Sequence, residues 1–147
     1  MRHLMFLLAL LLVFAVVHAT EPPAGRITYF DSTRVDAAFA KGMPLIETSH
    51  FKIHASRREA PGMAEIHERD TDIVHVLEGS AMLVTGGTAT APHTIAPEEI
   101  RGAAIAGGER RRIARGDVVV IPAGVPHQFL DVQAPLLYYV VKVGSSR

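Results

Sequence analysis

The sequence predicts an all-β domain, a sandwich or barrel, preceded by one short helix. From Pro44 onward, short β-prone runs are separated by Gly and Pro turn signals, a pattern typical of sandwiches and barrels. A convincing helical pattern occurs only between Asp31 and Gly42. The length of 147 residues argues for a single domain.

The N-terminal stretch is interpreted as a signal peptide, residues 1–19, and is set apart from the fold. Arg2 precedes the apolar run from Leu4 to Val17, and Val17-His18-Ala19 offers small residues at the positions that a signal peptidase reads. The run is short for a membrane span, which needs ~20 apolar residues. We therefore expect cleavage after Ala19, export to the periplasm or the exterior, and no stable membrane insertion afterwards. An uncleaved N-terminal anchor is the alternative.

Composition narrows the classes of function. The chain has no cysteine, so neither a disulfide framework nor a lipoprotein anchor is available. Lys and Arg number 15, as do Asp and Glu, so no overall basic field favours nucleic acid or an anionic membrane. The expected partner is a small molecule, and a homodimer is left open.

The rest of the chain divides into a lead-in with one helix and a barrel domain built from short strands. In the lead-in, residues 20–43, Asp31 or Ser32 is expected to cap the helix and Gly42 to follow its last turn. The barrel domain is assigned to residues 44–147, with a long inter-strand segment from Thr88 to Gly108 that is predicted to be a cover or an oligomer contact. Strands are expected at residues 50–55, 63–67, 72–77, 81–85, 110–114, 118–121, 127–132 and 136–143. A turn at Glu78-Gly79 is expected to join residues 72–77 and 81–85 as a hairpin.

Four residues form a candidate metal site. Glu65 and His67 are two apart on a predicted strand, so their side chains share a face. Asp72 opens the next strand, and a tight turn would return it beside that pair. Pro122 and Pro126 bend the chain before His127. Imidazole and carboxylate together suit a divalent ion such as Mn, Fe or Zn, with positions left open.

Two blocks of the chain resemble the paired motifs of the cupin superfamily. The second block has Gly116, Pro122, Gly124 and His127 at the spacing of the second cupin motif. The first block departs from its motif, because Glu65 stands where the first His is usual and Asp72 where Glu is usual. The resemblance covers about residues 51–143 and implies a single jelly-roll β-barrel with the metal ligands Glu65, His67, Asp72 and His127.

Other residues are assigned by strand alternation. Met63, Phe129 and Tyr138 are expected to line the pocket. Arg57 and Arg58 are expected in a solvated turn, with contact of one of them to an anionic substrate as the alternative. His75 should face away from the site, and His50 and His54 either line the cavity or lie on an exposed edge.

Three functions remain open on this basis. The first is a small-molecule metalloenzyme of dioxygenase, isomerase or lyase type. The second is a non-enzymatic module that binds a small ligand or a metal. The third is a structural cupin with a vestigial site, because fold does not determine function.

Overall fold

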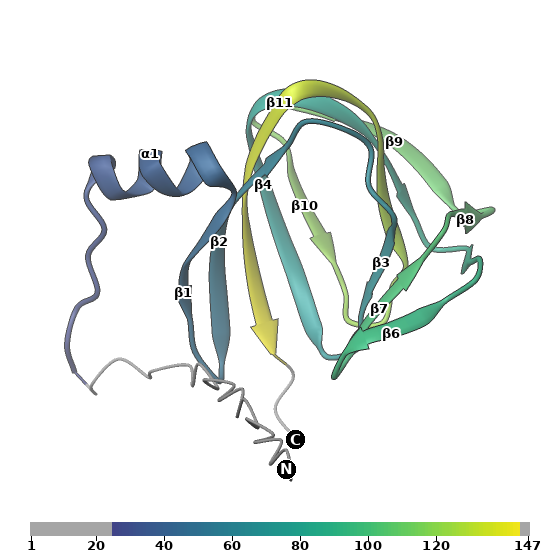
Figure 1. The fold of residues 1–147 in the computed structure, drawn as a ribbon, viewed down its shortest axis with the longest axis horizontal. Coiled ribbons are helices and arrows are strands. Elements are labelled where there is room, and N and C mark those ends of the chain that lie inside the picture. The colour runs from purple at the N-terminus through teal and green to yellow at the C-terminus, as the bar shows by residue number, and fades with distance from the viewer. Residues whose placement is uncertain (1–24, 145–147) are drawn as a thin grey trace, which may run out of the picture.

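Two long strands, β4 (Asp70–Thr85) and β11 (His127–Gly144), pair along most of their length and form the centre of the fold. The computed structural model describes residues 25–144. The signal-peptide prediction falls on residues outside this range. Figure 1 shows most of the strands in one strongly curled sheet, which confirms the all-β cupin-type fold.

The remaining strands extend the sheet on both sides of this central pair. The sheet order is β1-β2-β11-β3-β7-β6, while β9 and β10 both pair with β4, and β5 and β8 form a separate two-stranded sheet. The elements are β1 (Met43–Glu47), β2 (Phe51–Arg58), β3 (Ala64–His67), β5 (Thr88–Ala89), β6 (His93–Ala96), β7 (Glu99–Gly102), β8 (Ile105–Ala106), β9 (Glu109–Ala114) and β10 (Val118–Ile121).

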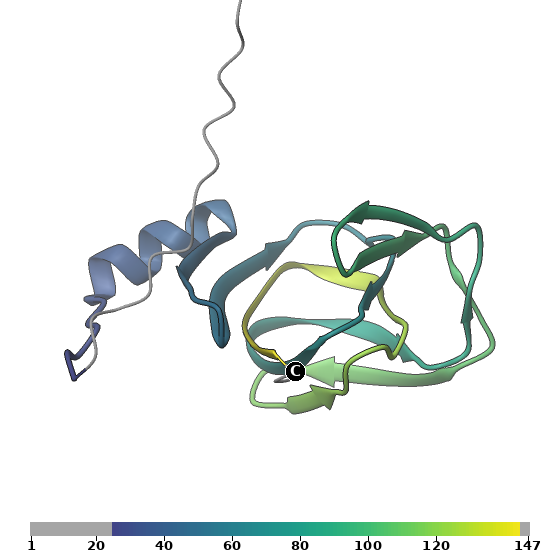
Figure 2. The same cartoon turned by 90° about the horizontal axis from the view of Figure 1, so that it is seen from below.

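The predicted helix is confirmed as α1 (Ser32–Lys41). Asp31 caps it by accepting a hydrogen bond from the Arg34 amide, and Gly42 ends it in the left-handed conformation. Phe39 packs edge-on against Tyr139 with ring centroids 4.9 Å apart. The helix therefore lies on the outside of the sheet, against β1 and β2, as Figure 2 shows.

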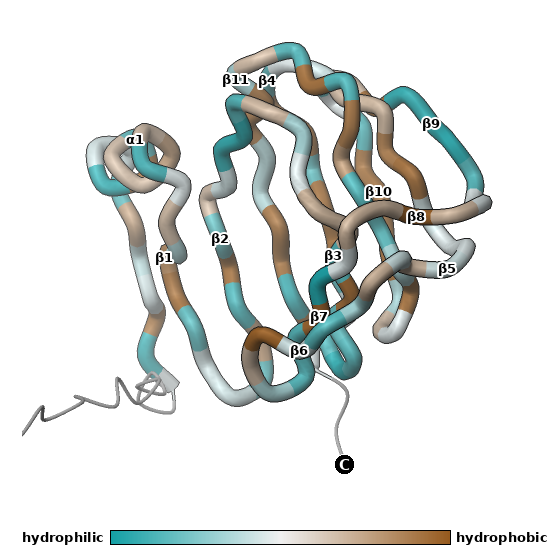
Figure 3. Tube along the Cα trace, turned by 45° about the vertical axis from the view of Figure 1, so that its right-hand side comes forward, coloured by the Kyte–Doolittle hydropathy of each residue, from teal (hydrophilic) through white to brown (hydrophobic). Residues whose placement is uncertain are grey.

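The interior is filled at one end by an apolar core. Strand alternation places one set of side chains inside, and Figure 3 shows apolar and polar residues alternating along the strands. The buried core comprises Val74, Val76, Ala81, Leu83, Ile113, Ile121, Phe129, Leu136, Tyr138 and Val140. Within residues 25–144, no helix has the length and apolar character needed to cross a membrane.

Two sequence expectations about strand ends are wrong. Residues 72–77 and 81–85 do not form a hairpin around Gly79, because both belong to the continuous strand β4, which bends there. Gly79 has a φ of +76°, and a Cβ at this position would meet the Pro135 carbonyl oxygen at 2.4 Å. Glycine is thus required where β11 passes the bend closely. Likewise, β11 is one strand rather than two.

The long segment from Thr88 to Gly108 contains strands rather than a loop. β6 and β7 form a hairpin, and β7 pairs in register with β3, so that Glu65 lies opposite Arg101 and His67 opposite Glu99. This pairing brings two charged residues of the segment next to the candidate site. The segment is therefore a wall of the cavity, in keeping with its expected role as a cover.

Candidate metal and ligand site

Three strands bring the four predicted site residues to one end of the barrel interior. Glu65 and His67 lie on β3, Asp72 on β4, and His127 is the first residue of β11. His127 pairs directly with Glu65 across β11 and β3. The two sequence motifs therefore meet through backbone pairing.

The bend before His127 is tied to the first motif. β10 ends at Ile121, and Gly124 follows with a φ of +78°. The Gly124 amide donates a hydrogen bond of 2.8 Å to the carbonyl oxygen of His67. This contact holds the Pro-rich turn against β3 and aims His127 inward, where its side chain is 3% exposed.

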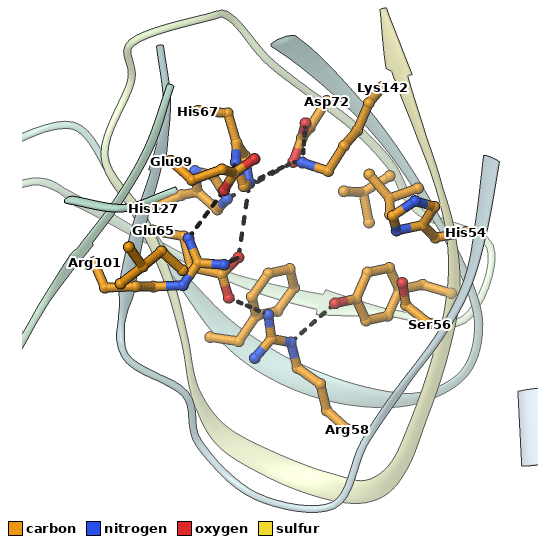
Figure 4. A pocket seen from close by; sticks show the side chains of 15 residues that line it. His54, Ser56, Arg58, Glu65, His67, Asp72, Glu99, Arg101, His127 and Lys142 are labelled. Atoms are coloured by element: carbon orange, nitrogen blue, oxygen red, sulfur yellow. Dashed lines mark hydrogen bonds and ion pairs between the residues drawn. The ribbon is translucent and has the colours of Figure 1, made fainter. Parts of the chain in front are cut away.

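The two imidazoles face each other inside the barrel. Their ring centroids lie 5.2 Å apart, and one ligand atom from each of Glu65, His67 and His127 lies within 4.8 Å of the others. The predicted convergence of His67 and His127 is thus confirmed. Figure 4 shows these side chains gathered on one side of the cavity, with His54 and Ser56 on the other.

Hydrogen bonds determine which ring nitrogens are available to a ligand. His67 Nδ1 donates to Glu99 Oε2 at 2.8 Å, and His127 Nδ1 donates to the Val125 carbonyl oxygen at 3.1 Å. Because both partners only accept, each neutral ring carries its proton on Nδ1 and has a free lone pair on Nε2. Burial lowers the pKa of His127 and favours this neutral form. Metal-ligating histidines typically show this arrangement.

Glu65 divides its two carboxylate oxygens between different neighbours. Oε1 accepts a hydrogen bond of 2.5 Å from Arg58 Nη2, and Oε2 lies 3.7 Å from His67 Nε2. Burial opposes ionisation of Glu65, but the Arg58 charge outweighs it and holds the pKa of Glu65 below its usual value. Glu65 is therefore a carboxylate with one oxygen directed toward the imidazoles.

Asp72 lies beside the imidazoles but is held by a lysine. Lys142 Nζ donates to Asp72 Oδ1 at 2.8 Å and to Oδ2 at 3.0 Å. Asp72 Oδ2 also lies 3.4 Å from His67 Nε2 and 3.8 Å from His127 Nε2. Asp72 thus stands next to the group of Glu65, His67 and His127, with both of its carboxylate oxygens bound by Lys142.

The site lines a cavity of about 420 Å³. Phe129 and Tyr138 line it, as their strand positions predict, whereas Met63 does not. Met63 precedes β3 and is 46% exposed. Strand alternation therefore does not extend back to it, and its expected place in the pocket is wrong.

Several lining residues were not assigned to the site from the sequence, although a place in the cavity was left open for His54. Arg58 belongs to β2 rather than a turn and points inward, where it also donates to the Tyr138 hydroxyl at 2.9 Å. His54, Ser56, Glu99, Arg101 and Lys142 complete the polar lining. Alternation along β2 from His54 to Arg58 was the available signal. For Glu99 and Arg101 the sequence offered no such signal, because their segment carried no strand pattern.

Histidines outside this group behave as expected. His75 is exposed on the outer face of β4, and His50 lies before the start of β2. His54 lines the cavity, which decides between the two alternatives left open for it.

Residues 18–144 match the sequence profile of the cupin family. The chain belongs to this family. The fold and the position of the candidate site therefore agree with the paired cupin motifs of the sequence. No curated protein sequence matches the chain significantly.

Three similar solved structures support the fold alone, because each shares at most 19% sequence identity with this cupin. Protein BH2720 of Bacillus halodurans is 15% identical, with a TM-score of 0.58 over 84% of this chain and 86% of that one. NMB1881 of Neisseria meningitidis is 14% identical, with a TM-score of 0.55 over 80% of this chain and 100% of its own. KdgF of a Halomonas species is 19% identical, with a TM-score of 0.50 over 70% and 78%.

Proposed function

We propose that this protein is a cupin that holds a divalent metal ion on Glu65, His67 and His127 and uses it to act on a small molecule. The carrying observation is that two buried imidazoles present free Nε2 lone pairs to the same point as a carboxylate oxygen. Two nitrogens and one oxygen suit Mn, Fe or Zn and leave positions open.

The residues around these three ligands supply the remaining chemistry. A bound ion would polarise an oxygen atom of the small molecule. Asp72, clamped by Lys142, lies within 4 Å of both Nε2 atoms and is placed to contact the ion through water or to move a proton. A carboxylate beside the reacting atoms favours isomerase or lyase chemistry over dioxygenase chemistry.

A non-enzymatic binding module is the second candidate. It is favoured by the close pairing of charges in the cavity, where Glu65 and Asp72 each have a cationic partner. In this case the same residues bind a ligand without turning it over. A homodimer remains a further proposal.

Metal analysis tests the proposal directly. We expect the purified protein, reconstituted with Mn, Fe or Zn, to bind close to one equivalent, and His67→Ala and His127→Ala to lose it. His75→Ala is the matched control, because this histidine is exposed on the outer face of the same barrel. Equal metal content in wild type and His127→Ala would leave a metal-free pocket and favour the binding module.

We also propose that the protein is exported with removal of residues 1–19, on the evidence of the apolar run from Leu4 to Val17. Mass spectrometry of the secreted protein should then find a chain that begins near Thr20.

A further inference from the structure

The positive and negative charges of the side chains that line the cavity are equal in number only when no metal ion is bound. Three carboxylates and three cationic side chains line it: Glu65, Asp72, Glu99, Arg58, Arg101 and Lys142. A divalent ion would add two positive charges to a largely buried space. Buried charge without a counter-charge is costly, so the metal-loaded cavity calls for an anion.

Arg101 is the cation in the cavity with the loosest contacts. Its Nη1 lies 3.2 Å from Glu99 Oε2, and its Nη2 lies 3.7 Å from Glu65 Oε2. In contrast, Arg58 and Lys142 hold their carboxylates at 2.5 and 2.8 Å. Arg101 can therefore take a new partner at the lowest cost.

Metal binding would free Arg101 further. The Glu65 oxygen near Arg101 is Oε2, which is also the oxygen nearest the imidazoles. A metal ion bound to this oxygen would compete with the Arg101 guanidinium for the lone pairs of the oxygen. Arg101, with 24% of its side chain exposed, would then stand beside the ion and in reach of an incoming molecule.

The rest of the lining indicates an organic anion. Val74, Phe129 and Val140 form an apolar part of the cavity, and Ile95 adds an apolar side chain from the β6–β7 hairpin. A carbon skeleton would bury these surfaces, which an inorganic anion would leave uncovered. A cavity of about 420 Å³ admits only a small molecule.

We propose that the metal-loaded cavity binds a small organic carboxylate whose anionic group is held by Arg101. This inference rests on the proposed metal site and specifies the class of molecule that it receives. Arginine suits this role because its planar guanidinium donates two parallel hydrogen bonds to a carboxylate.

The test uses Mn²⁺-loaded full-length protein and three small acids: acetate, lactate and succinate. Calorimetry and the Mn²⁺-enhanced relaxation of solvent protons report binding, each against the corresponding uncharged amide and against inorganic phosphate. We expect at least one acid to bind more tightly than its amide and than phosphate. Arg101→Gln should weaken that acid by about 10- to 100-fold, as loss of a charged hydrogen-bond partner predicts.

Two further variants separate the alternatives. Arg101→Gln should bind Mn²⁺ as tightly as wild type or more tightly, because a nearby positive charge is removed, and Arg101→Lys should recover part of the carboxylate affinity. Arg110→Gln, on the exposed part of β9, is the matched control and should change neither.

Each failure has a distinct meaning. No Mn²⁺ binding by wild type overturns the metal site and this inference with it. Mn²⁺ binding with equal affinity for acids and amides, or with unchanged acid affinity in Arg101→Gln, overturns the inference alone. Phosphate that binds more tightly than every acid refutes an organic ligand.

Discussion

The two ends of the barrel interior are built by the same pair of strands but carry opposite chemistry. Register aligns Asp72 with Lys142, Val74 with Val140, and Val76 with Tyr138 across β4 and β11. Inward-facing pairs thus change within a few residues from an ion pair to an apolar core. The pleat determines which residues point inward, and the side chains alone determine whether that end is packed or open.

This difference shows how a small barrel stays folded although part of its interior is a polar cavity. Apolar burial at the closed end stabilises the fold through side chains such as Leu83 and Leu136, which are almost fully buried. At the open end, by contrast, each charge is stabilised by a counter-charge. Substitutions at the two ends should therefore lower the stability of the protein for different reasons.

Loss of a counter-charge at the open end should have the largest effect. Lys142→Met leaves the buried Asp72 carboxylate without its partner, which should lower the free energy of unfolding by about 3–5 kcal/mol. Urea denaturation of the metal-free protein measures this change. The double variant Lys142→Met with Asp72→Asn should recover part of the loss, because the orphaned charge is removed.

A second lysine–aspartate pair provides the control. Lys52 donates to Asp70 at 2.7 Å, but its side chain is 35% exposed. Lys52→Met should therefore cost no more than about 1 kcal/mol. Equal losses in the two lysine variants would contradict the idea that burial makes the pair at the open end costly to break.

Removal of apolar volume at the closed end should have the next largest effect. Leu83→Ala deletes a side chain that is 1% exposed, which should cost about 3 kcal/mol through lost burial and the cavity left behind. Metal affinity should stay close to that of wild type. Met82→Ala, at the partly exposed neighbouring position on β4, should destabilise much less, and metal loss in Leu83→Ala would show that the two ends are coupled.

The smallest expected effect concerns acid stability. Burial would raise the pKa of Glu99, but the hydrogen bond from His67 and the nearby charges of Lys142 and Arg101 lower it from 4.5 to about 2. Because this pKa is depressed in the folded state, its contribution is present above pH 4.5 and is lost as the pH falls toward 2. Glu99→Gln should cost about 1–2 kcal/mol at about pH 5, after allowance for partial exposure, and less at about pH 3.

Denaturation of metal-free protein at the two pH values measures this change. Glu98→Gln is the matched control, because its side chain is half exposed and pairs with Arg69 at 3.4 Å. A gap between wild type and Glu99→Gln that stays constant with pH would exclude a role for the His67 contact in acid stability.

Local sequence signals predicted the parts of the fold that depend on neighbouring residues. The cap at Asp31 and the glycine at position 42 were enough to place α1. The turn predicted at Glu78-Gly79 is wrong, because a glycine between two β-prone runs is typical of a turn, whereas here it allows the close passage of β11. A close approach between two strands that are distant in sequence gives no signal in the residues next to either of them.

The sequence by itself determined the barrel class, because strand alternation and turn signals are local properties, and its resemblance to the paired cupin motifs implied that His67 meets His127. Only the tertiary structure decided that Lys142 clamps Asp72, that Arg58 holds one oxygen of Glu65, and that β7 brings Glu99 and Arg101 to the site. These contacts join residues 7 to 70 positions apart, and their electrostatic strength depends on burial that only the folded barrel creates.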